Sequence, residues 1–208
     1  MMTEFNEKQI EILQVAEQLF AEEGFDGTSV RDIAKKANVN VAMISYYFGS
    51  KEKMLESLVV NRISDMRLQL VSLYNENISP SAKIDKMIEL YISRINKNRC
   101  IYQILHYEFS TKKRDLNFES FTEVKKYNLK ALEQIIKEGQ DKGEFQQNIN
   151  VALIPPVIMG TYFHFHMNKP FYQEIFNLKT EEDYNNYIAT TLTAHIQKTI
   201  KALLVYEN

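Results

Sequence analysis

The chain has 208 residues, of which 45% are hydrophobic and 25% charged, and its formal net charge is −2. These values are ordinary for a soluble globular protein of one compact unit or two small helical ones, and they exclude an intrinsically disordered chain. The single cysteine, Cys100, excludes an internal disulfide and fits a reducing compartment, so we expect a cytoplasmic protein.

Two features argue against export and against a membrane span. Glu4, Glu7 and Lys8 stand where a signal peptide would need a basic start followed by an apolar run. The uncharged run 151–168 contains two prolines and two histidines, and it lies at the short limit for crossing a bilayer core of roughly 30 Å. We therefore expect no membrane contact and a buried helix at 151–168.

Charge is distributed unevenly near the start of the chain. Residues 1–27 carry seven acids against one lysine, whereas residues 28–53 carry five bases against two acids. The overall balance is not that of a typical nucleic-acid binder. The basic segment is nevertheless the part of the chain best suited to an anionic partner.

The first predicted helix covers about residues 6–23, where apolar residues recur at helical spacing. A second helix begins after Ser29, whose hydroxyl can cap it while Asp32, three residues on, completes a capping box. A third, short helix follows, with Ile44 and Phe48 facing inward.

The connection between the second and third predicted helices is a tight turn of three residues. Asn38 is the candidate for a left-handed backbone conformation there, because asparagine tolerates positive φ better than other residues except glycine. Asn40 is then the natural N-cap of the third helix. On pattern alone, such a pair of helices is either a DNA-binding helix-turn-helix or a structural corner.

The rest of the chain also reads as helix. A long helix is predicted from Ser50, as N-cap, to about residue 74, with a stop at Ser79 and Pro80. Further helices fit a stripe at 84–95 and the ranges 100–110, 117–141, 151–168 and 181–204, and Asn168 to Pro170 are expected to stop the fourth of these. Because no segment has the pattern of a strand, we predict an all-α fold.

The residues of the hairpin resemble the signature of the TetR/AcrR family. The resemblance covers about residues 8–55 and rests on Gly24-Phe25, Thr28 to Ala34, Val39 to Phe48, Ser50-Lys51-Glu52 and Leu55. It implies an N-terminal three-helix helix-turn-helix domain over 1–50, followed at 51–208 by a helical ligand-binding and dimerisation domain. It also implies a ligand-responsive homodimeric repressor that binds a palindromic double-stranded DNA operator.

The same resemblance assigns DNA contacts residue by residue. Phosphate contacts fall on Thr28, Tyr46, Tyr47 and Lys51, and base contacts on Arg31, Val41, Ala42 and Met43, with Ser29 and Ser45 completing the set. The chain departs from the commonest family pattern at Asn38, where glycine is frequent, and at Ser45, where a DNA-contacting tyrosine is frequent. The second departure removes a large contact, although serine can still bond a phosphate or a base.

Two of these assignments have plain structural alternatives. Tyr46 and Tyr47 could pack in the core, but Ile44 and Phe48 already occupy the inward face, so we expect at least one tyrosine to be exposed. Arg31 could grip a guanine edge, or it could form a surface salt bridge with an acid nearby.

The C-terminal part is rich in aromatic residues, which are usually core. The resemblance places an effector pocket between the helices from 84 to 168, and the lining candidates are Tyr91, His106, Tyr107, Tyr127 and His164. None of them indicates a particular small molecule, so the effector is unknown.

The resemblance also places a four-helix dimer interface on the helices at 151–168 and 181–204. The second of these carries a strip that we expect to meet a second copy: Tyr184, Tyr187, Ile188, Thr191, Leu192, His195, Thr199 and Leu203. A two-fold dimer would place its recognition helices about 34 to 36 Å apart, or a multiple of one DNA turn. Ligand binding would tilt the helix at 50–74 and weaken operator binding, provided that the ligand prefers the released state.

Two rival functions remain at this point. An enzyme is suggested by His164, His166, His106 and Glu108, but residues two apart on a helix point about 200° apart, so His164 and His166 cannot share a metal there. We therefore expect no catalytic residues, no metal and no cofactor. The other rival is a DNA-binding protein that takes no ligand and recruits other proteins, and activation is as open as repression.

Overall fold

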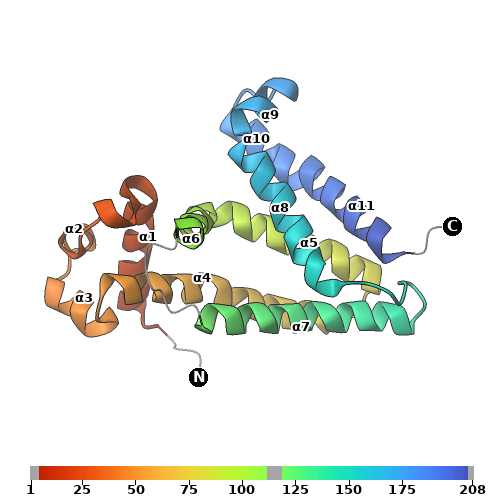
Figure 1. Ribbon diagram of the computed structural model, residues 1–208, viewed down its shortest axis with the longest axis horizontal. Coiled ribbons are helices and arrows are strands. Elements are labelled where there is room, and N and C mark those ends of the chain that lie inside the picture. Colours follow the sequence, from red (N-terminus) through yellow and green to blue (C-terminus); the bar gives the residue numbers. More distant parts are fainter. Residues whose placement is uncertain (1–4, 112–118, 206–208) are drawn as a thin grey trace. The chain divides into compact units, whose positions relative to one another are not determined.

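The computed structural model describes residues 5–111 and 119–205, and within these ranges every element is helical (Figure 1). The helices are α1 (Glu7–Gly27), α2 (Val30–Lys36), α3 (Val41–Phe48), α4 (Lys51–Tyr74), α5 (Pro80–Lys97), α6 (Arg99–Thr111), α7 (Glu119–Asp141), a 3₁₀ turn (Val151–Leu153), α8 (Ile154–Met167), α9 (Lys169–Ile175), α10 (Glu181–Tyr187), a π-helical segment (Ile188–Leu192) and α11 (Thr193–Leu204). The predicted all-α class is confirmed. No helix of the described ranges is long and apolar enough to cross a membrane.

The chain divides into two compact units. Unit 1 comprises residues 1–67 and 98–125, and unit 2 comprises residues 68–97 and 126–208. This division follows compactness, so α6 belongs with the N-terminal helices. The functional boundary predicted at residue 50 stays a prediction.

The core of unit 1 is formed by α1 and α6 together with the hairpin helices and the first half of α4. A capping box starts α1: the Gln9 amide donates to Asn6 Oδ1 at 2.9 Å, and the Asn6 amide donates to Gln9 Oε1 at 3.0 Å. The buried side chains of this core include Ile12, Leu13, Phe20, Ile33, Ile44, Phe48, Leu55, Ile101 and Ile104. This shared core fixes the hairpin to α1.

A largely buried ion pair joins α1 and α4 in unit 1. Glu17, of which 8% is exposed, accepts hydrogen bonds from Nε and Nη2 of Arg62 at 2.8 and 2.5 Å. Breaking a pair of this burial by removing one partner is costly, because the other charge stays partly desolvated. The pair therefore holds α4 against α1 in one arrangement.

In unit 2, α5, α8 and α11 pack through apolar faces. The buried isoleucine and methionine side chains of α5 recur at helical spacing and are Ile84, Met87, Ile88, Ile92 and Ile95. Gln197 and Lys201 on α11 tie this core to the rim of α5: the Gln197 amide donates to the Asp85 carbonyl at 3.1 Å and Lys201 pairs with the Asp85 carboxylate at 2.9 Å.

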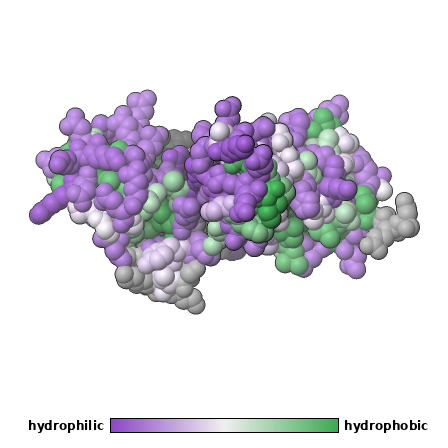
Figure 2. Space-filling model, turned by 90° about the horizontal axis from the view of Figure 1, so that it is seen from above, coloured by the Kyte–Doolittle hydropathy of each residue, from purple (hydrophilic) through white to green (hydrophobic). Residues whose placement is uncertain are grey.

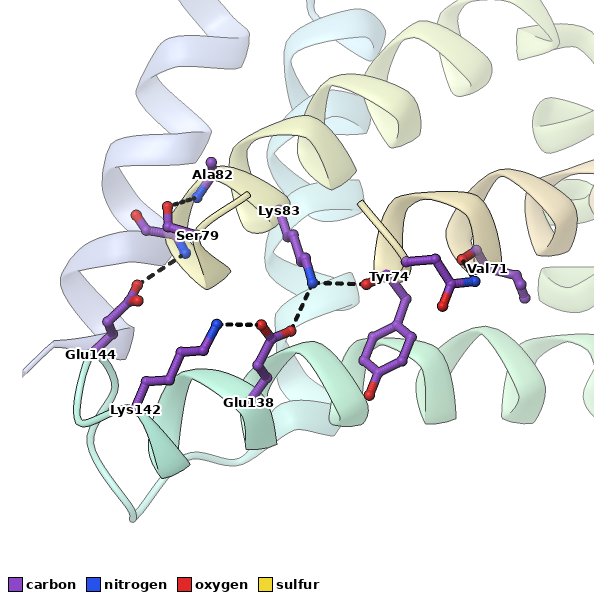
Figure 3. Close-up of polar contacts among 10 residues, drawn as sticks. Val71, Tyr74, Ser79, Ala82, Lys83, Glu138, Lys142 and Glu144 are labelled. Carbon is purple, nitrogen blue, oxygen red and sulfur yellow. Dashed lines mark hydrogen bonds and ion pairs between the residues drawn. The ribbon is translucent and has the colours of Figure 1, made fainter. Parts of the chain in front are cut away.

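A lysine is buried where α4, α5 and α7 meet in unit 2 (Figure 3). Lys83 Nζ donates to the Tyr74 carbonyl at 2.7 Å and to Glu138 Oε2 at 2.8 Å. Glu138 also accepts a bond from Lys142 at 2.7 Å, and the hydrogen bonds from Lys142 and Lys83 lower the pKa of that carboxyl. Three segments are thus joined at one buried charge.

The last long helical stretch is interrupted by the π-helical segment between α10 and α11. Thr193 Oγ1 donates to the carbonyl of Ile188, five residues back, at 2.7 Å. The apolar side chains that this stretch buries fall four residues apart: Tyr184, Ile188, Leu192, Ile196, Ile200 and Leu204. Thr193 is buried as well. The apolar side chains form the inner face of the stretch, and Thr191, His195, Thr199 and Leu203 lie on its outer face.

This arrangement corrects the predicted dimerisation strip. Tyr184, Ile188 and Leu192 are core residues of unit 2 and cannot meet a second copy. The prediction combined residues of two faces, because it assumed one regular α-helix over the segment 181–204. Only its outer residues, with Leu203 48% exposed, remain candidates for an interface.

The structure also contains a helix that the sequence reading missed. Asn168 does end α8, but Lys169 and Pro170 then open α9. Proline suits the first turn of a helix, because its missing N–H has no partner there in any case. Hydrophobic side chains reach the surface in this region, among them Met167, Phe171, Ile175 and Phe176, and Figure 2 shows hydrophobic residues at the surface among hydrophilic ones.

Candidate nucleic-acid interface and ligand-binding residues

The hairpin of α2 and α3 is built by the capping residues that the sequence predicts. Ser29 and Asp32 form a reciprocal capping box at the start of α2, and the bonds from Ser29 lower the pKa of the Asp32 carboxyl. Asn38 has φ of 51°, and Asn40 Oδ1 accepts from the Ala42 amide at 2.8 Å. The short turn and its two helices are therefore confirmed.

Most of the proposed base-contact residues lie on the outer side of the hairpin. Arg31, Val41, Ala42 and Ser45 are exposed, and Met43 is half-buried. A helix can present such a face to the major groove, because the groove is wide enough to admit it. The placement is compatible with base contact, which stays a prediction.

The two tyrosines of α3 differ in exposure. Tyr46 is 85% exposed, whereas Tyr47 is half-buried against the core of unit 1, with its ring 6.2 Å from that of Phe48. The expectation of at least one exposed tyrosine is confirmed. Tyr46 is the side chain that is free to reach a partner without leaving a packed position.

Arg31 does not form the salt bridge that was its structural alternative. Among the described residues no acid lies within ion-pair distance of its guanidinium, and the bridge to α1 is made instead by Lys36 with Glu22 at 3.6 Å. An exposed guanidinium on the outer side of the hairpin can offer two parallel donors to a guanine edge.

Three predicted DNA contacts are already engaged within the protein. Only 1% of Thr28 is exposed, and its hydroxyl donates to the Gly24 carbonyl at 2.9 Å. The Ser29 hydroxyl is bonded to Asp32. Lys51 Nζ donates to the carbonyls of Phe25 and Thr28, both at 2.7 Å. The assignment of DNA contacts to these three side chains stays a prediction, and a contact with a phosphate would have to compete with the protein groups that now bind them.

Two exposed cations on or next to the hairpin were not among the predicted DNA contacts. Lys35 on α2 and Lys53 on α4 are exposed and belong to the basic segment 28–53. Net charge along the chain was the signal that could have singled them out. Each can contribute to the salt-dependent attraction of a DNA backbone.

The five ligand-binding candidates fall in both units. His106 and Tyr107 are exposed residues of unit 1, and Tyr107 lines a pocket of about 350 Å³ between the end of α1 and α6. Tyr91, Tyr127 and His164 belong to unit 2, where the first two are half-buried and His164 is exposed. Their role in binding stays a prediction.

His164 lines a groove of about 580 Å³ in unit 2. The groove is bordered by α8, α9, the π-helical segment and α11, and its other walls include Phe165, Tyr172, Tyr187 and His195. Aromatic rings stack along it, with ring centroids 4.4 Å apart for Phe165 and Tyr172 and 5.5 Å apart for Phe165 and Tyr187. This groove lies on the helices predicted to form a dimer interface.

The histidines that suggested an enzyme are placed apart. His164 faces Tyr172 and the solvent, whereas His166 is half-buried and stacks on Tyr162 at 6.0 Å. In the ranges 5–111 and 119–205, no three or more histidine, cysteine or acidic side chains are grouped so that they could hold a metal ion.

Comparisons with known proteins agree with this architecture. Residues 12–58 match the family described as "Bacterial regulatory proteins, tetR family", and residues 51–187 match "YsiA-like protein, C-terminal region". The chain is 32% identical to the probable HTH-type transcriptional regulator YttP of Bacillus subtilis over 64% of its own length and 65% of that protein's. It is 26% identical to the fatty acid metabolism regulator protein of the same organism, over 74% of this chain and 79% of that protein.

A solved structure shows the same fold. The transcriptional regulator FadR from Bacillus subtilis, in complex with stearoyl-CoA, superposes with a TM-score of 0.70 at 21% identity, over 92% of this chain and 96% of that one. The matches confirm the resemblance predicted from the sequence. They also confirm the predicted function class, a DNA-binding transcription regulator.

Proposed function

Because this chain belongs to the TetR family of bacterial regulatory proteins, we propose that it is a homodimeric repressor, located in the cytoplasm, which leaves a palindromic operator when an acyl-CoA thioester binds. The observation that carries the DNA-binding part is the outer side of the hairpin. There an exposed Arg31 and a Tyr46 that is 85% exposed stand beside small and apolar residues suited to close approach.

The roles we propose follow from the chemistry of each side chain. Tyr46 donates a hydrogen bond from its hydroxyl to a phosphate, and Arg31 donates hydrogen bonds to a guanine edge. Val41 and Ala42 contact thymine methyl groups. Met43, Ser45 and Tyr47 support these contacts from the same helix. Thr28 and Ser29 act indirectly, since they hold the corner from which α2 starts.

For the dimer, we propose that α8 and α11 meet the same helices of a second copy. The outer residues Thr191, His195 and Leu203 and the groove beside them would lie at this contact. Such a two-fold arrangement matches the symmetry of a palindromic operator.

The ligand class comes from the relatives. One relative is a fatty acid metabolism regulator, and a regulator of the same fold holds stearoyl-CoA. We propose that a long acyl chain enters the helical domain of this protein, with Tyr91, Tyr127 and His164 of unit 2 as candidates for contact. His106 and Tyr107 belong to unit 1 and are separate candidates there. None of these groups suggests an enzymatic step.

Operator binding is the first expected result. Labelled DNA from beside the protein's own gene should bind in a palindrome-dependent way, and Tyr46→Ala should weaken binding by roughly tenfold or more, because a hydrogen bond to a charged group is lost. Fluorescence anisotropy at two salt concentrations would measure it. Tyr46→Phe, which removes only the hydroxyl, is the matched variant and should reproduce most of the loss. Neither variant should change the melting temperature.

Binding no tighter than to random DNA, after a selection from random sequences had also failed, would overturn the DNA-binding part of the proposal.

Release by acyl-CoA is the second expected result. Stearoyl-CoA added to the operator complex should lower operator affinity by about tenfold or more, since a ligand shifts the equilibrium only by its preference for the released state. Coenzyme A alone and stearate alone are the controls, and calorimetry would give the stoichiometry. If acyl-CoA thioesters of several lengths left operator affinity unchanged, the ligand class would be wrong while operator binding stood.

A further inference from the structure

Lys51, in the first turn of α4, makes two long-range hydrogen bonds beside the hairpin. Its Nζ atom donates to the Phe25 carbonyl and to the Thr28 carbonyl, both at 2.7 Å, and lies 4.3 Å from the centroid of the Phe25 ring. The residues joined are 26 and 23 positions apart in the chain. All of them belong to unit 1.

The two carbonyls lie at the corner between α1 and α2. The helix α1 is kinked at Gly24, where φ is +75°, and ends with Thr28 as its C-cap. The last carbonyls of a helix have no partner within it and carry partial negative charge. An ammonium placed against them satisfies both and complements their charge.

The rest of the corner is bonded around the same point. The amide and the hydroxyl of Thr28 both donate to the Gly24 carbonyl, at 3.2 and 2.9 Å. The ring of Phe25 is buried, so the cation rests on a fixed aromatic face. The two hydrogen bonds of Lys51 therefore join this corner to the start of α4.

We infer that Lys51 is a positioning residue, whose ammonium holds α4 to the α1–α2 corner, and that exposed cations of the segment 28–53 meet the DNA phosphates. A lysine has three donors, and two of them are used by these carbonyls. The inference rests on the proposed operator binding. It adds that one cation, Lys51, positions the hairpin while other, exposed cations contact the phosphates. A rotation of α4 would pull on the corner that carries α2.

The test compares Lys51→Gln with Lys53→Gln, which removes the same charge from an exposed side chain two residues along. Operator affinity is measured from about 50 to 200 mM salt. Lys51→Gln should weaken binding by about ten- to hundredfold, as expected for lost bonds to a charged group, with the salt slope of the wild type. Circular dichroism would establish that the variant is folded, so that the loss belongs to folded molecules.

A phosphate contact would give a different slope. If Lys51 neutralised one phosphate in each subunit, its loss would lower the slope of log affinity against log salt by about 1.8, because about 0.9 counterions are released per contact. A fall of that size for Lys51→Gln, larger than that for Lys53→Gln, would overturn the inference. Unchanged affinity for the folded variant would also overturn it.

Hydrogen exchange of the DNA-free protein provides a second readout. Amides of the segment 24–32 should exchange at least about threefold faster in Lys51→Gln than in the wild type or in Lys53→Gln, since local opening follows loss of the bond. Lys51→Arg, which can still donate to both carbonyls, should restore part of the protection. Unchanged exchange in Lys51→Gln would contradict the inference even if no operator were ever found, so the two proposals can fail separately.

Discussion

Replacing Lys83 with methionine is expected to lower the free energy of unfolding by about 3 kcal/mol, the lower end for breaking a buried ion pair. The side chain of Lys83 is 5% exposed and that of Glu138 is 23% exposed. Methionine fills a similar volume but leaves the Tyr74 carbonyl and one side of the Glu138 carboxylate without their donor (Figure 3). The smaller loss of stability is expected because the Glu138 carboxylate keeps its hydrogen bond from Lys142 and remains partly exposed to solvent.

Lys142→Met is the matched control, since Lys142 bonds the same carboxylate from the surface, with its side chain 51% exposed. Exposed pairs contribute little, so we expect a much smaller change than for Lys83→Met. Urea unfolding at one fixed protein concentration would measure both variants, because the proposed dimer would make stability depend on concentration. Equal effects of the two substitutions would mean that burial does not decide the strength of these bonds.

Replacing Gly139 with alanine is expected to destabilise the protein by about 2 kcal/mol or more, although alanine is normally the better helix former. A β-carbon on Gly139 would lie 2.1 Å from Cδ2 and 2.7 Å from Cγ of Phe145. The ring is 2% exposed and cannot swing into solvent. It is held there because the Glu144 and Phe145 amides both donate to the Gly139 carbonyl, at 2.8 and 3.1 Å.

Two comparisons isolate this clash. Gly27→Ala, where the new β-carbon would meet its nearest atom at an ordinary 3.6 Å, should change stability by about 0.5 kcal/mol or less. In a Phe145→Ala background, Gly139→Ala should cost much less than in the wild type, because its obstacle is gone. Thermal and urea unfolding would show it. A stabilising Gly139→Ala in the wild type would mean that the ring can move aside.

The sequence alone sufficed for the hairpin because its signals are local. Ser29 with Asp32, Asn38 and Asn40 each act within four residues, so their roles could be read without knowing the rest of the fold. The intramolecular bonds of Lys51 could not be predicted from the sequence for the opposite reason. Its long side chain can reach several partners, and only the folded corner decides that it meets the carbonyls of Phe25 and Thr28.

The helices of the C-terminal part were predicted less well than the hairpin, because some residue types are compatible with both the end and the start of a helix. Pro170 suits both the end of one helix and the first turn of the next, so α9 was missed. In the segment 181–204, inner and outer residues were mixed because the sequence does not announce the π-helical turn at Ile188–Leu192. The effector pocket could not be tested by such patterns, since its walls depend on tertiary packing.

The π-helical turn lets one buried stripe with a spacing of four residues run along the whole stretch from α10 to α11, although a regular α-helix has 3.6 residues per turn. Side chains buried every fourth residue, from Tyr184 to Leu204, drift by about 40° per step around a regular α-helix of 3.6 residues per turn. Five such steps would carry the stripe about halfway round, away from the core. A wider turn has more residues per revolution and takes up part of this excess. The π-helical segment thus rotates the side chains of α11 relative to those of α10. As a result, the residues that α11 exposes to solvent do not continue the exposed face of α10 at regular α-helical spacing.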